Sequence, residues 1–168
     1  MVAYRRFYQA GGCYFLTLTL ANRHSTLLTT YISEFKLALR YALEHYPCHL
    51  QTLVVLPEHL HMLLQLPQGQ LYYPKFVQSF KSRFSFLLHQ GGDFLNHKVW
   101  QDRYWEHCIR GEADWLRHLE YIHRNSVKHH QVSQVKNCPY SSFHRYAAKG
   151  WLDENWLGDD PSDGLFGE

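Results

Sequence analysis

Apolar and polar positions recur along the chain with two different periods, and each period indicates a type of element. Residues 13–20 alternate bulky and Thr side chains, which is typical of a strand. Apolar positions in residues 31–45 recur at helical spacing, which predicts a helix that Pro47 ends. Two apolar runs, 50–56 and 59–66, are separated only by Pro57 and Glu58, so we expect a tight antiparallel hairpin.

The rest of the pattern predicts two more helices and one strand. Residues 71–89 show helical spacing, 99–110 are an aromatic segment typical of an edge strand, and 113–128 form a third helix with Asp114 as the expected N-cap. This order predicts an α+β fold, a ferredoxin-like antiparallel sheet with helices on one face plus a C-terminal helix. The other face of the sheet is then open for a ligand. We expect one domain over residues 1–150 and a mobile tail over 151–168.

Charge is divided unevenly between these two parts. All 17 Lys and Arg residues precede residue 151, with nine of the 15 acids, so residues 1–150 carry +8 and residues 151–168 carry −6. A basic body suits a polyanion such as nucleic acid, although charge alone favours an ordinary solubilising surface. The four cysteines lack any short spacing, so we expect reduced thiols. No membrane-length apolar stretch or signal peptide is visible, and we expect a cytoplasmic protein without a membrane partner.

Two of the 13 histidines, His59 and His61, begin the second strand of the predicted hairpin. Successive strand residues point to opposite faces, so both imidazoles project to one side and Leu60 to the other. Two ligands on one strand can share a metal ion. A lone His-x-His pair is nevertheless a weak signal, because hydrogen-bonded or surface histidines are commoner.

The predicted third helix carries a tyrosine among basic residues. At about 100° per residue, one side holds Tyr121 and, within roughly 60° of it, Arg117, Arg124, Asn125 and Lys128. The apolar side lies about 100° or more away and consists of Trp115, Leu116, Leu119 and Ile122. We therefore expect Tyr121 to point away from the core and towards a phosphate. The alternative is an ordinary tyrosine that half-buries its ring.

These residue types belong together in phosphodiester chemistry. Attack by a phenol needs a group that can become a phenolate, a cation that polarises the phosphate, and an open coordination position. Two imidazoles and an amide oxygen, from His59, His61 and Asn125, leave such a position. Mixed N and O ligands without thiolate favour Mg²⁺ or Mn²⁺ over a structural zinc.

Five blocks of the chain resemble those of REP-associated tyrosine transposases, which are relatives of the single-tyrosine transposases of the His-hydrophobic-His endonuclease superfamily. The blocks are residues 4–6, 54–61, 100–107, 121–129 and 141–146. The resemblance implies that His59, His61 and Asn125 are metal ligands and that Tyr121 is the nucleophile that becomes linked to a 5′ phosphate. It also implies single-stranded DNA with hairpin-forming palindromes as the partner.

The sequence departs from the family pattern at Ser126, where proline is usual, and at His130, where glycine is usual. Without the proline, the third helix could extend one turn further.

Further basic residues are candidates for DNA contacts. Besides Arg117, Arg124 and Lys128 they are Arg5, Arg6, Lys81, Arg83, Arg103 and Arg110. Arg5 and Arg6 could read bases or be an ordinary solvated end, and the others could contact phosphates. Glu58 and Glu106 are candidates to support the histidines, with a surface role as the alternative.

The sequence thus predicts a metal-dependent single-strand DNA endonuclease and strand-transferase. The main alternative is a hairpin-binding protein that has lost cleavage, and a zinc-binding protein is a weaker one because no four-ligand set of short spacing exists. We expect a monomer, with a dimer as the alternative. The acidic tail could fold over the basic face and compete with DNA, or it could be a solubilising extension.

Overall fold

The computed structural model describes residues 7–91 and 97–158 of the chain. Its elements follow in the order β1 (Cys13–Thr19), α1 (Leu27–Thr30), α2 (Ile32–His45), β2 (His49–Val55), β3 (His59–Gln65), α3 (Tyr73–Gln90), β4 (Trp105–Cys108), α4 (Glu112–Lys128), the 3-10 helix η1 (Val135–Asn137) and α5 (Phe143–Ala148). Each predicted strand and helix has a counterpart in this order. The short helices α1, η1 and α5 are additions that the sequence pattern does not predict.

The four strands form one antiparallel sheet in the order β2-β3-β1-β4, which is the ferredoxin-like arrangement. The predicted hairpin is confirmed, since β2 and β3 pair and the Leu56 amide donates to the His59 carbonyl across the turn at 2.9 Å. Strand β4 lies at the sheet edge as predicted but is shorter than the segment 99–110. Trp100 forms only an isolated bridge with Leu20.

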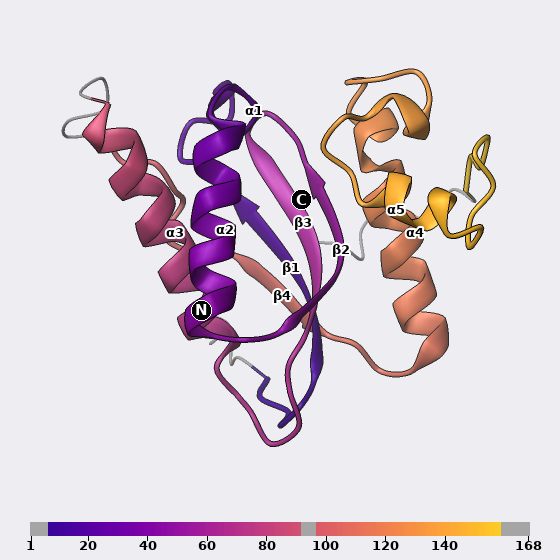
Figure 1. Ribbon diagram of the computed structural model, residues 1–168, viewed down its shortest axis with the longest axis horizontal. Helices are drawn as coiled ribbons and strands as arrows, with labels where there is room; N and C mark the ends of the chain where they lie inside the picture. Colours follow the sequence, from indigo (N-terminus) through magenta and orange to yellow (C-terminus); the bar gives the residue numbers. More distant parts are fainter. Residues whose placement is uncertain (1–6, 92–96, 159–168) are drawn as a thin grey trace, which may run out of the picture.

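Helices cover both faces of the sheet (Figure 1). Helices α2 and α3 lie together on one face, and α4, with α5 beside it, lies on the other. The expectation that the second face is open to a ligand is therefore wrong. Helix α4 packs against β2 and β3 there, so the polar face of the sheet is covered by a helix.

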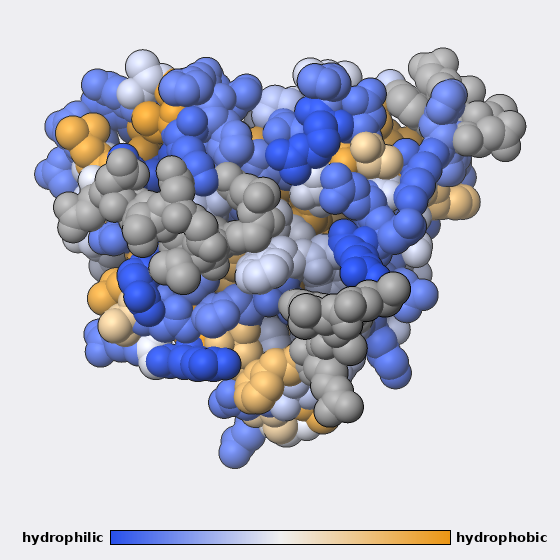
Figure 2. Space-filling view, turned by 180° about the vertical axis from the view of Figure 1, so that it is seen from behind, coloured by the Kyte–Doolittle hydropathy of each residue, from blue (hydrophilic) through white to orange (hydrophobic). Residues whose placement is uncertain are grey.

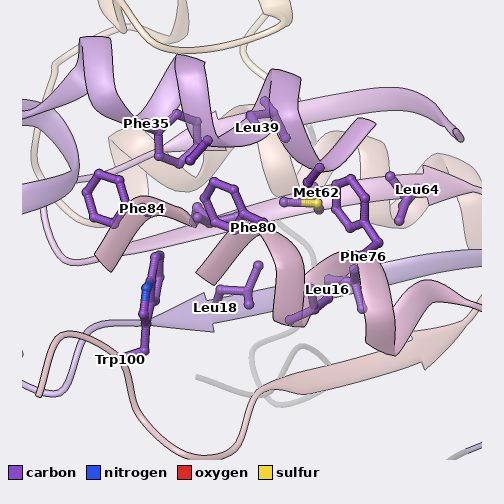
Figure 3. Close-up of a cluster of buried hydrophobic side chains, with 14 of the residues drawn as sticks. Leu16, Leu18, Phe35, Leu39, Met62, Leu64, Phe76, Phe80, Phe84 and Trp100 are labelled. Carbon is purple, nitrogen blue, oxygen red and sulfur yellow. The ribbon is translucent and has the colours of Figure 1, made fainter. Parts of the chain in front are cut away.

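Aromatic and aliphatic side chains fill the space between the sheet and helices α2 and α3 (Figure 3). Phe35 of α2 meets Phe80 of α3 edge-on at 5.2 Å between ring centroids, and Phe80 also packs on Trp100 at 5.6 Å. Leu16, Leu18 and Met62 complete this layer from the sheet (Figure 3). Burial of so many large side chains makes this layer the main source of hydrophobic stabilisation.

Helix α4 does not begin at the predicted N-cap, and it ends in a defined hydrogen-bond motif. Gly111 is the N-cap, so the prediction that Asp114 caps the helix is wrong. The helix runs through Ser126 to Lys128. His130 then adopts a left-handed φ of 55°, and the amides of His130 and Gln131 donate to the carbonyls of Val127 and Ser126. This is the Schellman arrangement, which usually places glycine at the left-handed position.

The described residues also bear on the cysteine and membrane expectations. All four cysteines are free, which confirms the predicted reduced thiols. Within residues 7–91 and 97–158, no helix has the length and apolar character needed to cross a bilayer. The face in Figure 2 is largely hydrophilic, with apolar residues in small separate patches.

Candidate active site

Strand β3 presents two chemically different sides. Leu60 and Met62 belong to the apolar layer beneath α2 and α3. His59 and His61 alternate with them and face α4, where both imidazoles are buried. The prediction that the two histidines share one side of the strand is confirmed. They come from a central strand with neighbours on both sides, which fixes their positions.

Helix α4 turns Tyr121 and Asn125 towards that strand. The Tyr121 side chain is 3% exposed, so the expectation that it points away from the core is wrong. Instead Leu116, assigned to the core side, is 44% exposed. Leu119 and Ile122, from the predicted core side, are buried as expected, and the buried side also holds polar groups that include His118 and Ser126. The buried side is therefore wider than a helical wheel that equates apolar with buried predicts.

The four predicted chemical residues meet within one chain. Nε2 of His59 lies 3.1 Å from Oδ1 of Asn125. The ring centroids of His59 and His61 are 5.0 Å apart, and those of His61 and Tyr121 are 5.3 Å apart. A histidine pair, an amide oxygen and a phenol therefore share one small volume between β3 and α4.

Each histidine is held through its other ring nitrogen. Nδ1 of His59 contacts Oε1 of Glu58 at 2.9 Å, and Nδ1 of His61 contacts the Thr17 hydroxyl at 2.8 Å. Burial by itself raises the pKa of the Glu58 carboxyl, but the hydrogen bond and charge of His59 lower it by more, so Glu58 is ionised. Contacts of this kind orient imidazoles for metal binding through Nε2.

The pairing of His59 with Asn125 is informative about what could bind there. When Nδ1 of His59 donates to Glu58, Nε2 carries a lone pair. Oδ1 of Asn125 is also an acceptor, so two acceptors face each other at 3.1 Å. A shared cation or a second proton on His59 would satisfy this arrangement. The donor set of imidazole nitrogen and amide oxygen suits a divalent metal.

Two residues near the site were not among the predicted chemical groups. His129 lies one helical turn after Asn125, and its ring centroid is 4.8 Å from that of His59. Glu58, His59 and His129 together offer three possible ligand atoms within 4.8 Å of one another. The spacing of four residues from Asn125 to His129 could have placed this histidine on the same side of the helix. Thr17 could not be found without knowing that β1 pairs with β3.

The two glutamates that were candidates to support the histidines, Glu58 and Glu106, have different partners. Glu58 supports His59, as described above. Glu106 is buried on the other face of β4 and interacts with Tyr73 of α3, raising the pKa of that phenol well above its usual value, after the larger effect of burial. The candidate role of Glu106 beside the histidines is therefore wrong.

The predicted DNA-contacting residues lie in different parts of the molecule. Lys128 is exposed, and its ammonium lies 5.1 Å from the centroid of the Tyr121 ring. The exposed residues Arg110 and Arg117 lie at and near the start of α4, and Arg103 is exposed in the loop before β4. Lys81 and Arg83 are on α3, on the opposite face of the sheet, so they do not join this site. Arg5 and Arg6 lie outside the described residues.

Arg124 differs from the other arginines because it meets the start of the acidic tail. Its guanidinium donates to the Gly158 carbonyl at 3.4 Å. Trp156, two residues earlier, stacks on Phe143 at 6.1 Å and meets His123 edge-on. Residues 151–158 therefore pack beside α4 and α5, and residues 159–168 of the predicted mobile tail lie outside the described part.

Comparisons with known proteins point to one family. The family model described as "Transposase IS200 like" matches residues 11–125. A REP-associated tyrosine transposase of Haemophilus influenzae is 39% identical over 167 residues, which is 95% of each chain. One of Escherichia coli is 39% identical over 160 residues, covering 95% of this chain and 93% of that protein.

A solved structure has the same fold. It is described as a REP-associated tyrosine transposase bound to a REP hairpin, and it matches with a TM-score of 0.91 and 38% identity. The match covers 100% of this chain and 98% of that one. The match confirms the predicted fold. The chain therefore belongs to the IS200-like transposase family, within its REP-associated tyrosine transposases.

Proposed function

We propose that this transposase is a metal-dependent single-strand DNA endonuclease and strand-transferase that cuts beside REP-type hairpins through a 5′-phosphotyrosine intermediate. One observation carries the proposal. The Tyr121 ring lies 5.3 Å from that of His61, while His59 and Asn125 meet at 3.1 Å in the same chain. A nucleophile and a metal-binding donor set are thus adjacent without help from a second subunit, which supports a monomer.

His59, His61 and Asn125 would hold the cation, which we expect to be Mg²⁺ or Mn²⁺. When bound, this ion supplies positive charge that polarises the scissile phosphate. Glu58 and Thr17 keep the histidines in the tautomer with a lone pair on Nε2. His129, close to Glu58 and His59, can serve as a further ligand or close the site against water.

Tyr121 performs the covalent step. Its hydroxyl loses a proton and the oxygen attacks phosphorus, forming the tyrosine–phosphate ester while the bond from phosphorus to the 3′ oxygen breaks. The departing oxygen takes up a proton and leaves as a free 3′ hydroxyl. Reversal by another 3′ hydroxyl joins strands and restores Tyr121. The Lys128 ammonium beside the ring stabilises negative charge on the phenol oxygen.

The site must open to admit DNA. His59, His61, Tyr121 and Asn125 are each at most 3% exposed. The C-terminal end of α4 offers the entry route, because Lys128 is exposed there and His129 is partly exposed. A DNA phosphate drawn to this basic end would reach Tyr121 by displacing the side chains of Lys128 and His129, while Asn125 stays beside His59. The exposed arginines Arg110 and Arg117 can hold flanking phosphates, which makes binding salt-dependent.

The direct test uses a single-stranded oligonucleotide with a REP-type hairpin and a flanking cleavage site. A strand labelled at its 3′ end should yield labelled protein on a denaturing gel, because the 3′ fragment remains linked to Tyr121 through its 5′ phosphate. A strand labelled at its 5′ end should yield only a shorter free product. Both products should require Mg²⁺ or Mn²⁺ and vanish with chelator.

Tyr121→Phe should abolish the adduct and leave hairpin binding intact. Tyr41→Phe, on α2 at the opposite face, is the matched control and should cleave normally. An undiminished adduct in Tyr121→Phe would falsify the assignment of the nucleophile. Tight hairpin binding by the wild-type protein without cleavage in any metal would favour the rival, a binding protein that no longer cuts.

A further inference from the structure

A second cluster of possible metal ligands lies beside β4, apart from the site described above. Its members are His107 of β4 with Asp114 and His118 of α4, and one ligand atom of each lies within 4.8 Å of the others. Asp114 and His118 are four residues apart, which places them on one side of the helix, and His107 approaches from the strand. Two elements thus contribute a His₂Asp donor set.

The distances are those of a compact site. Nε2 of His107 lies 2.8 Å from Oδ2 of Asp114. Nδ1 of His118 lies 3.2 Å from Oδ1 of the same carboxylate and 2.8 Å from the backbone carbonyl oxygen of Asp114, with which it is hydrogen-bonded. The two imidazole rings are stacked at 4.8 Å with an interplanar angle of 10°. Neighbouring ligand atoms around a tetrahedral metal at about 2.1 Å are separated by roughly 3.4 Å, so only small side-chain shifts would be needed.

The surroundings also suit a bound metal. The backbone amide of Arg110 donates to Oδ2 of Asp114 at 2.8 Å and orients the carboxylate. Asp114 and His118 are buried, whereas the His107 side chain is 32% exposed and provides an entry path from solvent. The nearby Arg117 side chain is 59% exposed, so its guanidinium can move into water when a cation arrives.

We propose that His107, Asp114 and His118 form a second metal site, selective for Zn²⁺ or a similar divalent ion with nitrogen and oxygen preference, that clamps α4 to the edge of the sheet. On binding, the His107 ring proton moves from Nε2 to Nδ1, and the His118 ring proton moves from Nδ1 to Nε2, which breaks the hydrogen bond to the Asp114 backbone carbonyl, so the lone pairs of His107 Nε2 and His118 Nδ1 face the metal. A water molecule supplies the remaining ligand on the exposed side. The donor set leaves this position open.

Phe15 links the clamp to the catalytic groups. Its ring lies 4.7 Å from His118, 5.5 Å from His61 and 6.0 Å from Tyr121. The two histidine clusters therefore both contact one aromatic ring, and the clamp would steady the helix that carries Tyr121. The ligands of the two sites are entirely different residues, so zinc can be assigned to one or the other by substitution.

The test counts zinc per chain by titration calorimetry in the full-length protein. His107→Gln should bind one zinc ion fewer than wild type, whatever the active site holds, whereas His24→Gln, an exposed histidine, should bind as many as wild type. Zinc at a hundredfold excess over its Kd should raise Tm by roughly 5 to 10 °C through this site, and His107→Gln should lose that rise.

His107→Asp separates a metal site from a hydrogen-bonded cluster. An aspartate can replace histidine as a ligand but repels Asp114 when no cation lies between them, so this variant should regain the zinc. Equal zinc content in wild type and His107→Gln, or failure of His107→Asp to bind more zinc than His107→Gln, would overturn the proposal. Neither result bears on cleavage at Tyr121, which is measured separately.

Discussion

The two faces of the sheet are packed by different kinds of side chain. Beneath α2 and α3, aromatic rings such as Phe80 and Phe84 pack with Leu and Met side chains. Beneath α4, buried histidines are held by hydroxyl, carboxylate and amide groups, and the apolar cluster is smaller. Burial of a polar group costs free energy unless the group is hydrogen-bonded, so each buried polar side chain beneath α4 needs a partner. The first face maintains the fold, and the second carries the candidate active site.

The largest expected effect is on the apolar face. Phe80→Ala should lower the free energy of unfolding by about 3 to 5 kcal/mol, because it leaves a cavity among fully buried rings. Leu116→Ala, on an exposed position of α4, should cost less than about 0.5 kcal/mol. Urea unfolding followed by circular dichroism measures both. Similar losses in the two variants would refute the assigned burial.

Acid should weaken the polar side first. Burial is the main cause that lowers the pKa of His123 on α4 to about 3, with Arg145 adding to it. Between this value and the unfolded pKa of about 6.5, the unfolded state binds more protons, so this stabilisation is complete above pH 6.5 and declines as pH falls. Lowering the pH from 6.5 to 4.5 should cost about 2 to 3 kcal/mol.

Two measurements localise that pH effect. His123→Gln should flatten the dependence of the unfolding free energy on pH, whereas His45→Gln, at an exposed position, should leave it unchanged. Hydrogen exchange at pH 4.5 should increase in α4 before α3. An equal increase in both helices would mean that the two sides of the sheet unfold as one unit.

Glu58 offers a smaller and more specific change. Glu58→Gln removes the charge that orients His59, and loss of such an outer partner typically weakens metal binding roughly 10- to 100-fold. The metal concentration for half-maximal cleavage should rise by that factor, while the rate at saturating metal stays close to wild type. Glu44→Gln, exposed on α2, is the control. An unchanged metal requirement would exclude a positioning role for Glu58.

The smallest effect concerns the end of α4. His130→Gly should stabilise the protein by about 1 kcal/mol, because glycine adopts a left-handed φ without the penalty that histidine carries. Helix α5 ends in the same hydrogen-bond motif with Gly150 at φ 70° in open space. Gly150→Ala should therefore destabilise by a similar amount. Thermal unfolding measures Tm for both variants. A change of Tm in the same direction in both would contradict the explanation.

The sequence predicts the elements better than the contacts between them. Strand alternation correctly separates His59 and His61 from Leu60, because a strand has only two sides. Helical spacing correctly places Leu119 and Ile122 in the core but misplaces Tyr121 and Asn125. These two are buried against polar partners on β3 that the helix sequence does not contain. Thr17 supports His61 only through the pairing of β1 with β3, a long-range relation that no local pattern carries.

The dual character of β3 restricts how this protein can change. Because side chains alternate strictly, gain or loss of one residue within the strand would exchange His59 and His61 with Leu60 and Met62, sending ligands into the apolar layer and leucine into the site. Such a change would disturb the apolar layer and the candidate site together, whereas a substitution at one position of β3 alters only one side of the strand.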